Sequence, residues 1–132
     1  MNSFTVRTAR RDEMVDVTRQ VNDIVRQAAV GQGLCVVFVP HTTAGVTINE
    51  HADPDVAQDI VAALDRIIPW NGPYAHSEGN SAAHVKASVV GPSVAIPVEA
   101  GKLHLGTWQG IFLCEFDGPR ARQVWVSLVQ GS

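Results

Sequence analysis

Short runs of alternating apolar and polar side chains, or of consecutive apolar side chains, predict a chain dominated by strands. These runs cover residues 4–8, 14–17, 34–39, 42–48, 94–98, 103–105, 111–116 and 123–129. The run at 34–39 is apolar throughout, so we expect a central strand that is covered on both faces. A turn at residues 117–120 separates the last two runs, which indicates antiparallel neighbours.

Two segments carry the three-and-four spacing of an amphipathic helix. In the first, Thr18 is a candidate N-cap, and Gly31 or Gly33 is expected to end the helix. The second begins at Asp53 and Pro54, because aspartate caps a helix and proline fits its first position. The apolar face of the first helix is Val21, Ile24, Val25, Ala28 and Ala29, and that of the second is Val56, Ile60, Leu64 and Ile67. With one or two helical turns at 84–90, the pattern predicts a single α+β domain over residues 1–132.

Composition and charge exclude several classes of protein. The 132 residues are 45% apolar and 17% charged, which is enough apolar material for a core but leaves few surface charges. Such a lean charged surface favours oligomerisation. The net charge of −3 and the lack of a basic cluster argue against nucleic acid as the main partner. No apolar run is long enough to cross a membrane.

The cysteines and the N-terminus point to a reducing compartment. Cys35 and Cys114 both lie inside apolar runs, which is typical of buried free thiols. The first residues lack the charged and apolar regions of a signal peptide. We therefore expect a soluble, cytoplasmic protein.

Two polar segments, at residues 41–54 and 106–110, interrupt the apolar runs. Burying polar side chains costs free energy unless each one finds a partner. We therefore expect these two segments to meet a ligand or each other, and to form one polar site.

Histidines are the candidate metal ligands. The five lie at positions 41, 51, 76, 84 and 104, and none belongs to an established ligand motif. His41 ends an apolar run and His84 follows the long loop at 70–83, and three imidazoles from separate segments can form a catalytic metal site. Each could equally be a surface or core residue with one hydrogen bond.

Two carboxylates are candidates for acid–base chemistry. Glu50 could be a general acid or base if burial raises its pKa, or it could stabilise the first turn of the helix at Asp53. Glu115 lies inside an apolar run, and alternation leaves open whether it faces inward with a partner or outward into water.

The segment at 106–110 and two basic residues are candidates for binding an anion. Gly106 and Gly110 bracket a rigid aromatic ring and an amide, so backbone N–H groups could bind an anion beside a planar ligand, or the glycines could simply form a turn. Lys86 and Arg120 could neutralise phosphate oxygens, or they could be solvated.

Several of these motifs together resemble the YjbQ-like family, also called the secondary thiamine-phosphate synthase family. They are His-Thr-Thr-Ala-Gly-Val-Thr-Ile-Asn-Glu at 41–50, Asp53-Pro54, Gly-Asn at 79–80, His-Val-Lys-Ala-Ser at 84–88 and Gly-Thr-Trp-Gln-Gly at 106–110. The resemblance covers residues 4–131. It implies one compact α+β domain with a large twisted, mostly antiparallel sheet packed by two main helices, assembled as a homotrimer with sites near the subunit boundaries.

The resemblance also implies a set of site residues. The implied catalytic residues are Asn49, Glu50, Gln109 and Glu115. The implied substrate-binding residues are Thr42, Thr43, Lys86, Ser88, Gly106, Thr107, Trp108 and Gly110. The implied metal ligands are His41, His76 and His84, which suit zinc or another transition metal better than magnesium, while His51 and His104 are left out. The family often has aspartate two residues before His84, where this chain has Ala82, and loss of that carboxylate would weaken metal affinity.

Three functions are compatible with this set of residues. The first is a transferase of the thiamine-phosphate synthase type, which joins hydroxymethylpyrimidine pyrophosphate to thiazole phosphate. The second is a metal-dependent hydrolase of a small phosphorylated or carbonyl metabolite, with Glu50 as the base. The third is a non-catalytic trimeric module that binds a small anion. The expected partner is a small anionic metabolite, for example a phosphorylated one, and neither nucleic acid nor membrane is expected.

Overall fold

The computed structural model, which describes residues 1–131, contains eight strands. They are β1 (Asn2–Arg7), β2 (Glu13–Asp16), β3 (Gly33–Phe38), β4 (Ala44–Glu50), β5 (Ser93–Glu99), β6 (Lys102–Leu103), β7 (Gln109–Glu115) and β8 (Ala121–Gln130). A five-stranded sheet has the order β1-β8-β3-β5-β6, and a three-stranded sheet has the order β2-β7-β4. Every pairing is antiparallel, and each strand lies within two residues of its predicted bounds. The predicted α+β class is confirmed.

Three helices accompany the sheets: α1 (Thr18–Gln27), α2 (Pro54–Ile67) and α3 (Ser81–Val90). The predicted start of α2 is correct, because the Asp53 carboxylate accepts the Asp55 N–H at 2.9 Å. At α1 the prediction was wrong at both ends. Val17 is the N-cap and Thr18 is already helical, which leaves the Thr18 hydroxyl free for another role. Ala28 caps the other end, and Ala29 with φ 56° turns the chain before either glycine is reached.

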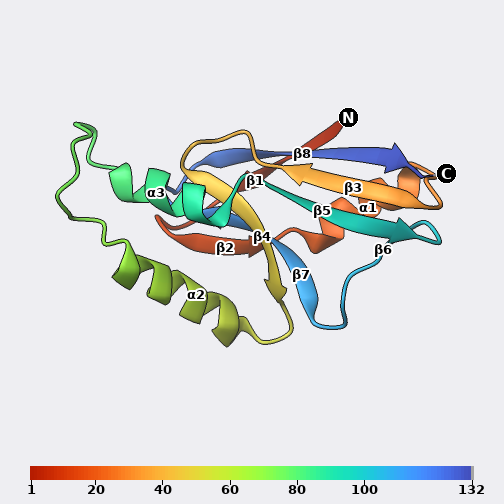
Figure 1. The fold of residues 1–132 in the computed structure, drawn as a ribbon, viewed down its shortest axis with the longest axis horizontal. Helices are drawn as coiled ribbons and strands as arrows, with labels where there is room; N and C mark the ends of the chain where they lie inside the picture. Colours follow the sequence, from red (N-terminus) through yellow and green to blue (C-terminus); the bar gives the residue numbers. More distant parts are fainter. Residues whose placement is uncertain (132) are drawn as a thin grey trace.

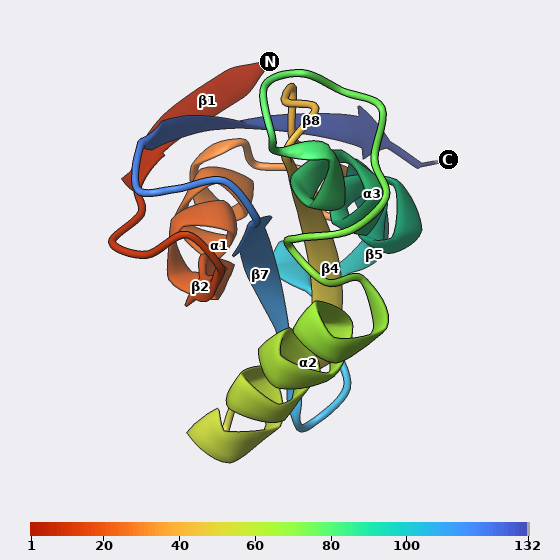
Figure 2. The same ribbon diagram turned by 90° about the vertical axis from the view of Figure 1, so that its left-hand side faces the viewer.

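The main core lies between the two sheets and α1. Val21 and Val25 of α1 are fully buried there, together with inward residues of both sheets. A second cluster, which includes Phe112 and Phe116, packs the other face of the three-stranded sheet beneath α3. β7 is the middle strand of that sheet (Figure 2). Its residues from Gly110 to Glu115 are all buried.

Helix α2 stands apart from the rest of the domain (Figure 1). Its predicted buried face is wrong, because no residue of α2 is buried and Ile67 is 74% exposed. Val56, Ile60 and Leu64 are half-buried. The apolar spacing correctly indicates a helix with an inner face, but that face meets the domain only in part.

The outer face of the five-stranded sheet is also open. Cys35 and Val37 of β3 point into the core, whereas Leu34 and Phe38 are exposed, so the prediction of two covered faces was wrong. Phe38 stacks instead on Trp125 of β8, with ring centroids 5.8 Å apart. A homotrimer stays a prediction.

Two further predictions concern the thiols and the membrane. Cys35 and Cys114 are buried and free, as expected, and burial raises the pKa of Cys35 to about 11 and that of Cys114 to about 12. Within residues 1–131, each helix is too short or too polar to cross a bilayer. A cytoplasmic location stays a prediction.

Candidate functional site

Pairing of β4 with β7 brings together the two polar segments found in the sequence. The register places Asn49 opposite Gly110 and Glu50 opposite Gln109. One residue further on, the His51 N–H donates a hydrogen bond of 3.0 Å to the Trp108 carbonyl. The expected meeting of these segments is therefore confirmed at the level of the backbone.

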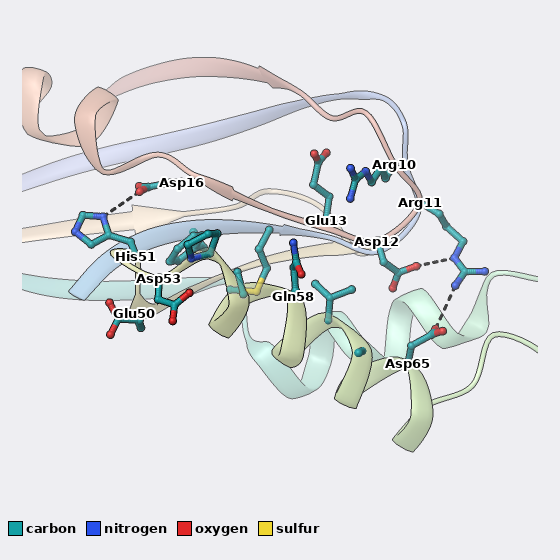
Figure 3. A pocket seen from close by; sticks show the side chains of 16 residues that line it. Arg10, Arg11, Asp12, Glu13, Asp16, Glu50, His51, Asp53, Gln58 and Asp65 are labelled. Atoms are coloured by element: carbon teal, nitrogen blue, oxygen red, sulfur yellow. Dashed lines mark hydrogen bonds and ion pairs between the residues drawn. The ribbon is translucent and has the colours of Figure 1, made fainter. Parts of the chain in front are cut away.

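A pocket of about 770 Å³ lies between β2 and α2, next to this meeting point (Figure 3). Met14, Phe112, Ala57 and Val61 contribute apolar lining. Six carboxylates also line the pocket: Asp12, Glu13, Asp16, Glu50, Asp53 and Asp65. Figure 3 shows Asp16, Glu50, His51 and Asp53 gathered at one end and Arg11, Asp12 and Asp65 at the other. Cavities of this size are typical of small-molecule sites.

The imidazole of His51 is held at the first of these two ends. Its ring lies so close to Gly110 that a Cβ on that glycine would be 2.4 Å from the His51 Cγ, a distance that no real side chain tolerates. Its Nδ1 lies 2.9 Å from Oδ2 of Asp16. Its Nε2 has no hydrogen-bond partner within residues 1–131.

Asp16 is itself held by the start of α1. Its Oδ1 accepts the Thr18 N–H at 3.0 Å and the Thr18 hydroxyl at 2.5 Å. The Thr18 hydroxyl in turn accepts the Ile111 N–H at 2.8 Å. Burial acts to raise the pKa of Asp16, but the hydrogen bonds from Thr18 and His51 favour the charged carboxylate, and the net result is a lowered pKa.

Sequence reasoning missed this group of residues. It left His51 out of the metal ligands, considered Thr18 only as an N-cap, and did not consider Asp16. Asp16 and His51 are 35 residues apart, on segments that meet only because β2 and β4 flank β7. Gly110 was the available signal, since a glycine inside a strand often marks a close approach by another group.

Glu115, predicted to be catalytic, lies in a closed ion-pair cluster in the core. Its side chain is fully buried, and the guanidinium of Arg122 binds both its carboxylate oxygens, with Nε 2.8 Å from Oε1 and Nη2 bonded to Oε2. The Thr8 hydroxyl donates to Oε1 at 2.8 Å. Burial acts to raise the pKa of Glu115, but these bonds and the Arg122 charge lower it overall. Thr43, predicted to bind substrate, accepts Arg122 Nη2 through its hydroxyl at 2.8 Å.

Lys86, predicted to bind phosphate, is fully buried in a second ion-pair cluster. Its ammonium lies 2.6 Å from Oδ2 of Asp12 and 2.8 Å from Oδ1 of Asp65. The hydrogen bond from Lys86 is the main reason why the pKa of Asp65 is lowered. A phosphate would have to displace both carboxylates, so the geometry does not support that contact.

The three predicted metal ligands do not converge within one chain. The rings of His76 and His84 meet edge to face, with centroids 5.5 Å apart. His41 instead accepts the Gln123 N–H on its Nε2 at 2.9 Å, and burial and the Arg122 charge lower its pKa. Within residues 1–131, no three His, Cys, Asp or Glu side chains are grouped to hold a metal ion. A transition metal on these histidines stays a prediction.

The remaining predicted residues make local contacts. Asn49 Oδ1 accepts the Glu50 N–H, Glu50 Oε2 accepts the Ala52 N–H, Gln109 Oε1 accepts the Gly106 N–H and the Ser88 hydroxyl donates to the His84 carbonyl, all at 2.8 or 2.9 Å. Glu50 thus supports the loop that leads into α2, whereas the acidic residue in the first turn of that helix is Asp55. Thr42, Thr107 and Trp108 are exposed, and the 63% exposure of Trp108 leaves its ring free.

The molecule is thus an α+β domain of two antiparallel sheets, with a polar pocket between its second strand and second helix. The family model described as UPF0047 protein YjbQ-like matches residues 2–131. The chain therefore belongs to the YjbQ-like UPF0047 family, as the sequence motifs predicted.

Relatives support this assignment over nearly the whole chain. UPF0047 protein YugU of Bacillus subtilis is 46% identical over 130 residues, which is 98% of each chain. UPF0047 protein MJ1081 of Methanocaldococcus jannaschii is 48% identical over 126 residues, 96% of this chain and 91% of the relative. A solved family member from Clostridium acetobutylicum matches with a TM-score of 0.96 at 51% identity, over 98% of this chain and 100% of that one.

The predicted transferase function is corrected by these comparisons. A solved YbjQ-like protein from Sulfolobus solfataricus, with a TM-score of 0.95 and 37% identity over 98% of this chain and 96% of that one, is described as being of unknown function. The names of the B. subtilis and M. jannaschii relatives carry no activity either. Membership of this family does not imply thiamine-phosphate synthase activity, so the function drawn from the resemblance was wrong.

Proposed function

We propose that this protein is an enzyme that moves a proton on a small molecule, with His51 as the general base. The observation that carries the proposal is the placement of the imidazole. Gly110 beneath the ring and Asp16 at Nδ1 fix its position, while Nε2 has no hydrogen-bond partner within residues 1–131. Histidine is the side chain best suited to accept and return a proton near neutral pH.

The chemistry follows from the partner of each ring nitrogen. The Asp16 carboxylate accepts the Nδ1 hydrogen, so the neutral ring presents a lone pair at Nε2. A proton that leaves the bound molecule moves to Nε2, and its bonding electron pair stays on that molecule. The negative charge of Asp16 stabilises the resulting imidazolium until Nε2 returns the proton.

The pocket favours a neutral or cationic molecule with an apolar part. Six carboxylates line it, against the guanidinium groups of Arg10 and Arg11 and the buried ammonium of Lys86, which pairs with Asp12 and Asp65, so negative charge remains in excess. An anion would be repelled by this charge balance, whereas Met14, Phe112 and Val61 offer apolar contact. A small anionic metabolite, the partner predicted from sequence, would need another site on the chain.

Solvent exchange tests the proposal without knowledge of the natural substrate. The protein is incubated in D2O with a panel of small neutral and cationic carbonyl compounds and amines, and deuterium incorporation is measured by mass spectrometry. We expect one or more compounds to exchange, and His51→Gln to lower the rate by about 100-fold or more.

His104→Gln is the matched control, because His104 is an exposed histidine that does not line the pocket. It should keep the full rate, and both variants should keep the melting temperature of the parent. Exchange that survives in His51→Gln, or that is equally lost in His104→Gln, would contradict the role of His51.

A further inference from the structure

The Thr18 hydroxyl occupies a position in which its hydrogen can point in one direction only. It lies 2.8 Å from the Ile111 backbone nitrogen and 2.5 Å from Oδ1 of Asp16. A backbone N–H can only donate, so the hydroxyl oxygen accepts from Ile111. The single hydroxyl hydrogen is then left for the Asp16 carboxylate.

Asp16 in turn determines which ring nitrogen of His51 carries the hydrogen. Its Oδ1 accepts both the hydroxyl and the N–H of Thr18, and its Oδ2 faces Nδ1 of His51 at 2.9 Å. An ionised carboxylate has no hydrogen to donate, so Nδ1 must carry the hydrogen in this bond. The neutral imidazole therefore has its lone pair on Nε2.

The backbone of β7 positions both His51 and Thr18. Gly110 provides the flat surface on which the His51 ring lies, and the next residue, Ile111, provides the N–H that orients Thr18. Thr18 makes no capping bond, since the N-cap of α1 is Val17 and has no side-chain bond. Helix capping thus does not explain the hydroxyl.

We infer that Thr18 is a positioning residue, which acts through Asp16 to hold His51 in the tautomer with hydrogen on Nδ1. This inference rests on the proposed function for its catalytic meaning, because the general base needs its lone pair on Nε2. Its structural content is independent of any substrate. Thr18 would raise the rate of proton transfer without touching the bound molecule.

Nitrogen NMR of the labelled protein measures the tautomer directly. The correlations between ring nitrogens and ring hydrogens show which nitrogen of a neutral histidine carries the hydrogen, and His104 serves as the internal reference. The parent and Thr18→Ser should both show hydrogen on Nδ1 of His51. Thr18→Val, which keeps the shape and loses the hydroxyl, removes one of the two bonds that hold the Asp16 carboxylate against Nδ1. The carboxylate can then turn away from the ring, and His51 should show a mixture of the two tautomers.

Exchange rates separate this inference from the proposed function. For a compound that the parent exchanges, Thr18→Val should be about tenfold slower and Thr18→Ser close to the parent. If the parent shows hydrogen on Nε2, or if Thr18→Val leaves both the tautomer and the rate unchanged, the positioning role is overturned, while the His51→Gln result still decides the general base.

Thr18→Val leaves the Ile111 N–H without a partner, which can destabilise the fold. A second variant, at the acceptor Asp16, therefore tests the same inference independently. In Asp16→Asn the amide can donate its hydrogen to Nδ1, which would move the ring hydrogen to Nε2. We expect that tautomer in Asp16→Asn. Retention of hydrogen on Nδ1 in this variant would contradict control of the tautomer by residue 16.

Discussion

Two polar clusters of this domain, one around Glu115 and one around His51, differ in whether a polar atom is left without a hydrogen-bond partner. The Glu115 cluster is closed, because Arg122, Thr8 and the Asp117 N–H bind the carboxylate inside the core. The His51 cluster is open, because hydrogen bonds run from the Ile111 backbone to Nδ1 of His51 and the other ring nitrogen has no partner within residues 1–131. A closed cluster stabilises the fold, whereas an open one can exchange a proton with a ligand.

The largest expected effect comes from breaking the closed cluster. Arg122→Met leaves the Glu115 carboxylate buried without its cation, because both side chains are almost fully inaccessible to water. We expect the free energy of unfolding at pH 7 to fall by about 3–5 kcal/mol. Urea denaturation followed by circular dichroism measures the change.

A double variant is the control for this prediction. Arg122→Met combined with Glu115→Leu removes both charges, and we expect it to be more stable than Arg122→Met alone. A double variant that is less stable than Arg122→Met would show that the pair contributes more than the cost of an isolated buried charge.

Disturbing the support of the open cluster should affect activity more than stability. In Gly110→Ala the new methyl group would collide with the His51 ring, so the imidazole must leave its position. We expect proton exchange to slow by about 100-fold, and the free energy of unfolding to fall by only about 1–3 kcal/mol.

Gly106→Ala is the comparison for that variant, measured by the same exchange and denaturation experiments. A Cβ there would meet the flexible side chain of Gln109 at 3.1 Å, which can move aside. Equal loss of activity in Gly106→Ala and Gly110→Ala would contradict a specific role for the surface beneath His51.

Acid should produce a smaller and graded effect on the closed cluster. The pKa of Glu115 is lowered in the folded protein from its ordinary value of 4.5. Its stabilising effect is therefore fully present above pH 4.5, and it is lost as the pH falls through the lower folded value. Urea denaturation at pH 6, 4.5 and 3.5 should show this decline.

The double variant of Glu115 and Arg122 sharpens the acid measurement. It lacks the carboxylate, so its stability should fall less steeply with acid than that of the parent. Asp16, Asp65 and His41, whose pKa values are also lowered, remain in both proteins and contribute to the rest of the slope. Identical slopes would exclude Glu115 as a source of the acid sensitivity.

The sequence predicted the strands well because alternation reports which side chains face a core. It predicted the start of α2 because Asp53 and Pro54 act locally. It could not predict that α2 remains mostly uncovered, since apolar spacing identifies an inner face and not what that face meets. For the same reason the run at 34–39 looked covered on both sides, although Leu34 and Phe38 face outward.

The site was harder to predict because its contacts join distant parts of the chain. Lys86 looked free to bind phosphate, yet its partners lie 74 and 21 residues away. The histidines of the family motifs were predicted as site residues, whereas His51 was not. Its contacts with Asp16 and Gly110 form only when β2, β7 and β4 pair in one sheet. Tertiary pairing of this kind is not contained in local spacing.

The central position of β7 affects which parts of the molecule unfold locally. This strand is paired on both edges and buried from Gly110 to Glu115, so its amide hydrogens should be among the slowest to exchange with water. Helix α2, the opposite wall of the pocket, has no buried residue and should open at a much lower free energy. The α2 wall of the pocket should therefore move more readily than the β7 backbone against which the imidazole lies.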